Sequence, residues 1–240
     1  MLDDARRSVR AVATPERATG SLRYFKTGPG EYGEGDKFLG VGAPDLRRLA
    51  REFQAMPLRD VRTLLTSEWH EERTLALLIL VRQYERGDQP VRAAIYDAYL
   101  RSTRHINNWD LVDCSAAQIV GAHLADRSRA PLRHLAKSSS LWERRVAIIA
   151  TMHFIRRGEF DETLHIAEML LADRQDLIHK AAGWMLREVG SRNQAVEQKF
   201  LDRHVAAMPR TMLRYAIEKF PEPLRRRYLS RQASNKSFTE

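Results

Sequence analysis

Apolar residues along this chain recur with the spacing of amphipathic helices. They follow the i, i+3, i+4, i+7 pattern of a single helix face, whereas the alternation of a half-buried strand is almost absent. Clear stripes are Leu46-Leu49-Ala50-Phe53, Leu75-Leu78-Ile79 and Ile148-Met152-Ile155. Breaks in the pattern fall at Gly87-Asp88, Arg127-Ser128, Ser138-Ser139-Ser140, Gly158 and Gly190-Ser191. The pattern predicts an all-α fold of about a dozen helices, each roughly 10 to 18 residues long.

Four segments share a repeated feature, a tryptophan near a charged residue that is followed closely by alanine or serine. The charged anchors are Arg73, Asp113, Arg145 and Lys180, spaced by 40, 32 and 35 residues. A period of this size is typical of stacked helix pairs. Such pairs bury their apolar faces against their neighbours and build a curved solenoid with a concave surface. A plain helical bundle is the competing interpretation.

The composition fits a single soluble domain that works in a reducing compartment. The 240 residues are 43% hydrophobic and 30% charged, as in ordinary globular proteins. We expect one domain over residues 1–230 and a disordered polar tail over 231–240. The only cysteine, Cys114, cannot form an internal disulfide. No signal peptide or membrane span is expected, because the longest apolar run, Leu75 to Val81, is short. The chain is therefore predicted to be cytoplasmic.

The charge balance points to a polyanionic partner. The formal net charge is +9, and arginine, whose planar fork suits phosphate, supplies most of it. Nucleic acid is the favoured partner, ahead of an anionic membrane. A basic surface without any partner is the alternative that charge alone leaves open.

The repeat anchors are the candidate functional residues. Arg73, Arg145 and Lys180 are natural phosphate ligands if their equivalent positions line one concave face. Asp113 is the one acid in that row. A carboxylate there weakens binding to a polyanion unless it has another task, although a plain ion pair with a neighbouring arginine is the alternative.

Tryptophans accompany two of these anchors at helical spacing. Asn108 looks like the cap of a helix on which Trp109 and Asp113, four residues apart, share a face. Asp110 is expected to point elsewhere and to complement the positive end of the helix dipole. Lys180 and Trp184 repeat the same spacing. Stacked repeats would thus bring two indoles and one carboxylate to a common groove, although ordinary core packing is the alternative for each tryptophan. Core packing is the interpretation chosen for Trp69 and Trp142.

An acid and indole rings inside a basic groove suit a cationic group within a polyanion. Tryptophan faces attract cations, and a carboxylate stabilises positive charge and can orient water. Purines alkylated at N3 or N7 in DNA are cationic and leave as neutral bases. The developing sugar cation then needs stabilisation, and no lysine nucleophile is required.

Other features are assigned no chemistry. The glycine-rich segment 28–42 must be a loop, and its Gly28-x-Gly30-x-x-Gly33 lacks the strand and helix of a dinucleotide site. Cys114 is expected to be a buried thiol facing away from Asp113 rather than a nucleophile. The histidines are scattered without metal-ligand spacing, so no metal and no cofactor are predicted.

At these residues the chain resembles a known family. The matching stretches are Tyr24-Phe-Lys26, Lys37-Phe-Leu-Gly-Val-Gly42-Ala-Pro44, Asn107-Asn-Trp109-Asp-Leu-Val-Asp113, Trp142-Glu-Arg-Arg145-Val-Ala-Ile and Gly183-Trp184-Met-Leu-Arg-Glu-Val-Gly190. They resemble the AlkD family of DNA alkylation-repair glycosylases, in chain order. The resemblance implies a right-handed superhelical solenoid of HEAT-like antiparallel helix pairs with a basic concave groove. It also implies hydrolysis of the N-glycosidic bond of 3-methyladenine and 7-methylguanine type lesions, without metal or cofactor.

The resemblance also implies roles for individual residues. Asp113 matches the family's catalytic aspartate, and Trp109 and Trp184 match aromatic residues that contact the lesion nucleotide. Among the expected DNA-binding residues, Arg145 matches one that grips DNA beside the lesion, and Tyr24 matches one near the damaged pair. Lys37, Arg73 and Lys180 complete that expected set. The implied partner is double-stranded DNA with alkylated bases, bound by a monomer without an obligate protein partner.

The chain departs from the family at one helix start. Gly42-Ala43 precede Pro44 where characterised members carry Gln-Thr, so a polar DNA contact and a helix cap are expected to be lost. Two other functions stay open from the sequence. One is a non-catalytic module that binds distorted or branched DNA, and the other is a protein-interaction scaffold.

Overall fold

The protein is all-helical. The computed structural model describes the backbone of residues 1–236 and the side chains of residues 1–232. Within that range 15 α-helices form and no strand does, and Lys37 and Trp69 pair only as an isolated bridge. The prediction of an all-α fold is confirmed. The chain divides into two compact units, Met1–His123 (unit 1) and Leu124–Glu240 (unit 2), where the sequence suggested one domain over 1–230.

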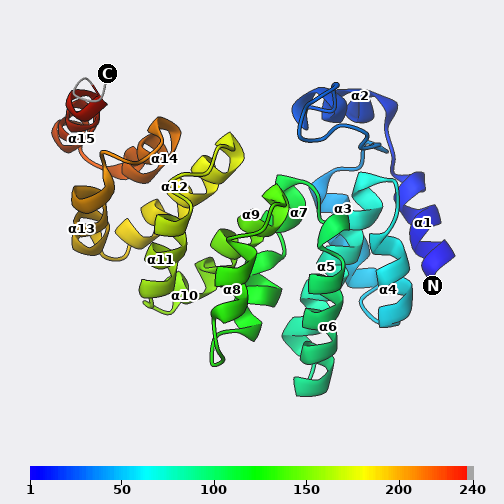
Figure 1. Ribbon diagram of the computed structural model, residues 1–240. Helices are drawn as coiled ribbons and strands as arrows, with labels where there is room; N and C mark the ends of the chain where they lie inside the picture. Colours follow the sequence, from blue (N-terminus) through cyan, green and yellow to red (C-terminus); the bar gives the residue numbers. More distant parts are fainter. Residues whose placement is uncertain (237–240) are drawn as a thin grey trace. The chain divides into compact units, whose positions relative to one another are not determined.

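Unit 1 contains seven α-helices, α1 to α7 (Figure 1). Their bounds are α1 Leu2–Ala11, α2 Pro15–Tyr24, α3 Ala43–Glu52, α4 Leu58–Leu65, α5 His70–Arg86, α6 Gln89–Arg101 and α7 Trp109–Asp113. A 3-10 turn spans Thr103–His105, and a π-helical turn spans Ala117–Gly121. The long helix α5 packs against α3, α4 and α6 and carries the core of the unit. This packing of sequential helices is typical of a helical solenoid.

Unit 2 is also built from sequential helices that pack against one another. Its helices are α8 Ala130–Leu135, α9 Leu141–Ala150, α10 Met152–Arg156, α11 Asp161–Met169, α12 Asp176–Gly190, α13 Gln194–His204, α14 Arg210–Ala216 and α15 Glu222–Lys236. The helix α12 is central and packs against α9, α13 and α14. A Cβ on Gly183 of α12 would lie 2.4 Å from the Met212 carbonyl oxygen, so the absent side chain allows α14 to approach closely.

The C-terminal segment differs from the sequence expectation. The helix α15 runs on through Arg231 to Lys236, so residues 231–236 of the predicted disordered tail are helical. Residues 237–240 lie outside the described part of the chain.

The first turn of α5 is built from four consecutive buried polar residues, His70, Glu71, Glu72 and Arg73. Buried charges are tolerated when they are paired and hydrogen-bonded. Glu72 is paired with two arginines of α1, because Arg6 and Arg10 lie 3.4 and 3.3 Å from its carboxylate.

Glu71 instead holds the loop that precedes α3. Its carboxylate accepts the backbone N–H groups of Leu39, Gly40 and Val41 at 2.9, 2.7 and 3.2 Å. Three donors to one carboxylate form a strong, charge-assisted arrangement. The loop that leads from the glycine-rich segment into α3 is therefore anchored to α5.

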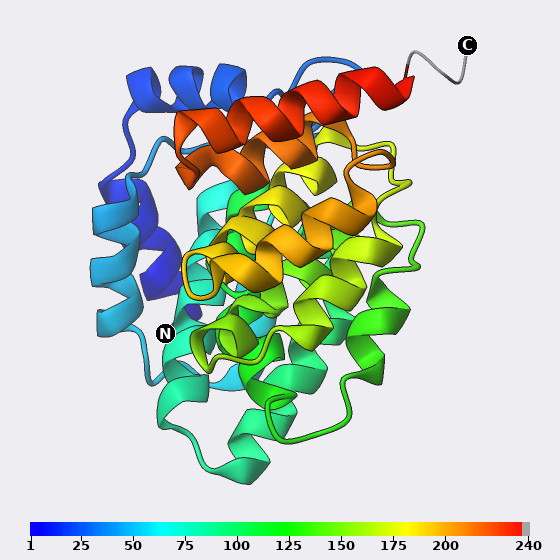
Figure 2. The ribbon, with the colours of Figure 1, turned by 90° about the vertical axis from the view of Figure 1, so that its left-hand side faces the viewer.

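The helix α2 packs differently from the rest of unit 1. None of its residues is buried, and Figures 1 and 2 both show it set apart from α3, α4 and α5. It is held mainly at its two ends. Gly40, with φ +80°, passes against its first turn, and Phe25 follows its last residue.

A buried acid in unit 2 gives the first testable prediction. Glu197 on α13 is 1% exposed and lies against Gly190, and one of its carboxylate oxygens has no hydrogen-bond partner. Burial raises its pKa to about 8, against a smaller opposing effect from the charge of Arg187. The group is therefore held neutral at pH 7 in the folded protein.

Glu197→Gln is expected to stabilise the protein at pH 9 and to change little at pH 5. A raised pKa favours the folded state fully below the unfolded value, and this advantage is lost as the pH rises through 8. The glutamine stays neutral, so its gain at pH 9 is on the order of 2 to 4 kcal/mol. Urea unfolding at the two pH values measures it, with the exposed Glu85→Gln as the control. An equal effect at both pH values would contradict the prediction.

Candidate functional site

The short helix α7 presents the two central candidates of unit 1. Asn108 is fully buried at the N-cap position of α7, and its side-chain oxygen accepts the N–H of Trp109, the first helical residue, at 2.8 Å. Trp109 and Asp113 lie one turn apart, and both are half-buried. Asp113 is therefore neither enclosed in the core nor fully exposed.

Trp109 belongs to a cluster of rings, which we call the aromatic cluster: Tyr24, Phe25, Phe38, His70 and Trp109. Phe25 stacks on Trp109 with ring centroids 5.5 Å apart, and Tyr24 meets Trp109 edge-on at 5.8 Å. Tyr24 is 65% exposed. Within the cluster Phe38 and His70 are buried, Phe25 and Trp109 are half-buried, and Tyr24 is exposed.

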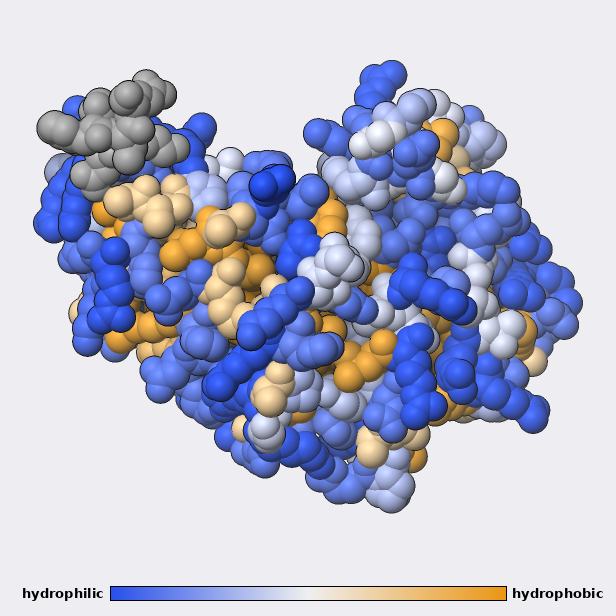
Figure 3. Space-filling view, viewed as in Figure 1, coloured by the Kyte–Doolittle hydropathy of each residue, from blue (hydrophilic) through white to orange (hydrophobic). Residues whose placement is uncertain are grey.

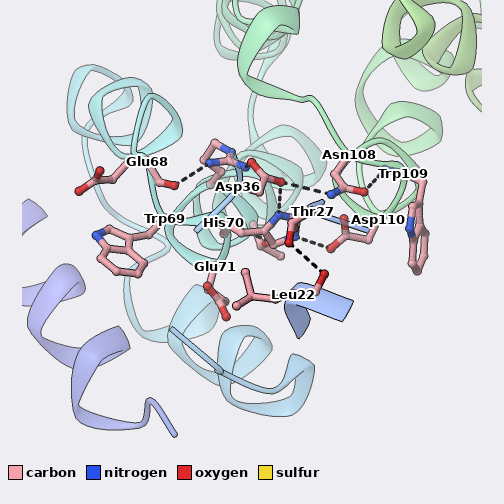
Figure 4. A network of polar contacts seen from close by, with 12 residues as sticks. Leu22, Thr27, Asp36, Glu68, Trp69, His70, Glu71, Asn108, Trp109 and Asp110 are labelled. Carbon is pink, nitrogen blue, oxygen red and sulfur yellow. Dashed lines mark hydrogen bonds and ion pairs between the residues drawn. The ribbon is translucent and has the colours of Figure 1, made fainter. Parts of the chain in front are cut away.

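A polar network shares His70 with the aromatic cluster (Figure 4). Asp36 is at its centre and accepts from Asn108 at 3.2 Å and from Arg73 at 2.6 Å. His70 lies between two acids, with Nδ1 3.3 Å from Asp36 and Nε2 2.8 Å from Asp110. Burial opposes the charged form of His70, but the two hydrogen bonds outweigh it and raise its pKa to about 9. Burial likewise opposes ionisation of Asp36, yet His70 and Arg73 hold its pKa below the usual range.

The network corrects one interpretation made from the sequence and adds to another. Arg73 is 4% exposed and pairs with Asp36 while donating to the Ser67 carbonyl oxygen, so it is not available to a phosphate. Asp110 lies in the first turn of α7, as expected for an acid that complements the helix dipole, and it also accepts a hydrogen bond from His70.

The candidates of unit 2 fall into two groups. Arg145 on α9 is 4% exposed and donates to the Leu177 carbonyl oxygen at 2.6 Å, which argues against the predicted phosphate contact. Lys180 and Trp184 lie one turn apart on α12, and both are partly exposed. Lys180 pairs with Asp176 at 2.7 Å. A solvent-accessible ion pair of this kind contributes little and can exchange for a phosphate.

The remaining predicted residues have mixed outcomes. Lys37 is exposed and pairs with Glu68 at 2.6 Å. Trp69 and Trp142, expected in the core, are only half-buried. Gly42 precedes α3 without any side-chain cap, in line with the cap expected to be lost there.

Cys114 has the environment of a structural thiol. Its sulfur donates to the Leu111 carbonyl oxygen at 3.4 Å. Burial, with the neighbouring charges of Asp110 and Asp113, raises the pKa of the thiol. The protonated thiol is a poor nucleophile.

The glycine-rich loop uses its own acids where a phosphate loop would bind phosphate. The backbone N–H groups of Gly28 and Gly30 donate to Glu31 and Glu34, each at 2.9 Å. Anion-binding loops need such N–H groups free. The fingerprint-like glycines are therefore turn residues.

Neither a metal cluster nor a membrane span is found among the described residues. No group of three or more histidine, cysteine, aspartate or glutamate side chains in this part of the chain is arranged to hold a metal ion. None of the helices over residues 1–236 is long and apolar enough to cross a membrane. Figure 3 shows that hydrophilic residues cover most of the face in view.

Taken together, the fold and these residues define an all-helical, arginine-rich protein in which a half-buried acid, Asp113, lies one helical turn from Trp109 of the aromatic cluster. The chain belongs to the DNA alkylation repair enzyme family, whose sequence model matches residues 5–220. Membership supports a role in DNA repair and the DNA binding that such a role requires.

One solved structure extends the comparison. A predicted DNA alkylation repair enzyme from Enterococcus faecalis matches with a TM-score of 0.67 and 18% sequence identity, covering 88% of this chain and 97% of that chain. At this identity the likeness concerns the fold. No curated protein matches the chain significantly.

Proposed function

We propose that the protein is a monofunctional DNA glycosylase that removes cationic N3- and N7-alkylated purines from duplex DNA. The observation that carries the proposal is the placement of Asp113 and Trp109 on α7, where the two half-buried residues lie one helical turn apart. Family membership directs this placement toward alkylated DNA. The protein would work as a monomer in the cytoplasm, through HEAT-like repeats.

The chemistry follows from the charge of the lesion. When the N-glycosidic bond breaks, its electron pair goes to the base and cancels the positive charge, so the base leaves as a neutral molecule. The sugar becomes oxocarbenium-like and needs a nearby negative charge. Asp113 supplies that charge and orients the water that adds to C1′, whose proton passes to the carboxylate or to solvent.

Aromatic side chains and cations bind the rest of the nucleotide. Trp109 and Tyr24 offer ring faces and edges to the sugar and the base, and indole faces attract cationic groups. Trp184 and Lys180 on α12 are proposed as further DNA contacts, together with Lys37. The buried Arg73 and Arg145 support the fold instead.

Release of free base from methylated DNA tests the proposal. Duplex DNA treated with a methylating agent is incubated with the protein, and the supernatant is separated by chromatography. We expect 7-methylguanine and 3-methyladenine to appear, with the strands left intact until alkali cleaves the abasic sites. Unmethylated duplex is the control. Duplex binding without any base release would contradict the proposal and favour a non-catalytic DNA-binding module.

A further inference from the structure

The helix α7 is too short to hold its own orientation. It spans only Trp109–Asp113, and helices of this length are not stable without tertiary contacts. Its first turn has three contacts of this kind. Asn108 donates to Asp36, Trp109 stacks on Phe25, and Asp110 accepts from His70.

His70 joins all three contacts. Its two ring nitrogens face Asp36 and Asp110, which lie in different segments of unit 1. Its ring faces pack against Phe25 and Phe38, with centroids 4.9 and 4.6 Å away. Its backbone N–H donates to the Lys37 carbonyl oxygen at 2.8 Å, which fixes its place on α5.

We propose that His70 is a positioning residue: by donating to Asp36 and Asp110 at once, it fixes the orientation of α7 and thereby of Trp109 and Asp113. The inference rests on the function proposed above, because the orientation of Asp113 matters most if it acts on a sugar. His70 itself touches no substrate in this scheme.

The double contact requires the imidazolium form. A neutral imidazole has one N–H donor, so it can serve only one of two facing carboxylates. The charged groups that face His70 are Asp36 from the loop before α3, Asp110 from α7 and Arg73 from its own helix. The two acids outweigh Arg73, in keeping with the pKa of about 9. Loss of this proton leaves one carboxylate facing a lone pair and loosens α7.

Activity is expected to fall on the alkaline side. The pKa of His70 is raised, so its contribution to the fold is complete below 6.5 and is lost as the pH rises through 9. Base release by the wild-type protein should therefore decline between pH 8 and 10 without global unfolding.

His70→Gln tests the proposal through the rate of base release. Glutamine can donate to one carboxylate but carries no charge. At pH 7.5, the single-turnover rate at saturating protein is expected to fall on the order of tenfold to a hundredfold, the cost of a misplaced group. The dissociation constant for duplex DNA should change little, and the fall in rate near pH 9 should disappear. His134→Gln, an exposed histidine of α8, is the matched control and should keep the wild-type profile.

A second measurement needs no catalysis. The emission of Trp109, taken as the difference between proteins with and without Trp109→Phe, is titrated from pH 6 to 11. Tyr24→Phe is present throughout, because a tyrosinate 5.8 Å from the indole would quench it. A transition with its midpoint near 9 is expected, and His70→Gln should remove it.

The outcomes separate the two proposals. A folded His70→Gln protein with the wild-type rate and the wild-type transition would overturn the positioning role. A purely structural role would lower the melting temperature of His70→Gln but leave the pH profile of its folded molecules unchanged, and would also overturn the proposal. If the wild-type protein releases no base, the proposed glycosylase function fails, and the titration of Trp109 still decides whether His70 positions α7.

Discussion

Replacing Asp113 with asparagine is expected to reduce base release from methylated duplex DNA on the order of 10²- to 10³-fold. The amide keeps the size and shape of the carboxylate but offers no negative charge to the developing sugar cation. Asp113 is half-buried on α7, where a charge acts more strongly than in bulk water. Single-turnover kinetics at saturating protein isolate this chemical step.

DNA binding by Asp113→Asn should be equal to that of the wild-type protein or tighter. Removal of an acid from a surface that meets phosphates relieves repulsion. Asp97→Asn, on an exposed position of α6 in the same unit, is the matched control and should release base normally. Normal turnover by Asp113→Asn would remove the carboxylate from the mechanism, and loss of binding together with activity would point to a structural role.

The largest effect on stability is expected for Gly40→Ala, at roughly 2 to 6 kcal/mol of unfolding free energy. Gly40 has φ +80°, a conformation that is strained for any other residue. A Cβ there would also lie 2.1 Å from the Thr14 carbonyl oxygen and 2.5 Å from the Ala18 nitrogen. Both atoms are backbone of the α2 region and cannot move independently.

Gly35→Ala separates the two causes. Gly35 has a similar φ of +82°, but a Cβ added there would meet no atom within 4 Å. Gly35→Ala should therefore lose only the unfolding free energy that backbone strain costs, on the order of 1 kcal/mol. Urea unfolding of both variants measures the difference. Equal losses would show that the contact between Gly40 and α2 contributes nothing.

The helical fold was accessible from sequence because periodicity is a local property. Stripes such as Leu75-Leu78-Ile79 need no distant partner to be recognised, and they lie on largely buried helix faces. The candidate site on α7 could be predicted for the same reason, because it also depends on residues close together in the sequence. Asn108 caps the helix, and the four-residue spacing places Asp113 one turn from Trp109, as the sequence predicted.

Arg73 and Arg145 show where local reasoning fails. Both looked like phosphate ligands because they recur at repeat positions and carry charge. Their partners lie far along the chain, with Asp36 37 residues from Arg73 and Leu177 32 residues from Arg145. A cation buried against a distant acceptor gives the same sequence signal as a cation in a groove.

His70, Phe25 and Phe38 were missed for a related reason. His70 sits in a run of four polar residues ahead of an apolar stripe, a pattern that usually marks an exposed helix start. Phe25 precedes the glycine-rich segment 28–42 and Phe38 lies within it, and neither residue gave a periodic signal of its own. Only the folded chain brings these rings together, with Phe25 stacked on Trp109.

The contacts of the first turn of α5 couple the local unfolding of α1 to that of α7. Glu72 is satisfied by α1, Glu71 by the loop before α3, and His70 by α7, all within one helical turn. Fraying of α1 would remove both arginines from the buried Glu72 carboxylate, which would keep the Ser67 hydroxyl at 2.8 Å, and would weaken the whole turn. The native ensemble should therefore contain few molecules in which the N-terminal helix is open while α7 stays in place. Amide protons of these two distant segments are then expected to exchange with solvent through one shared opening event.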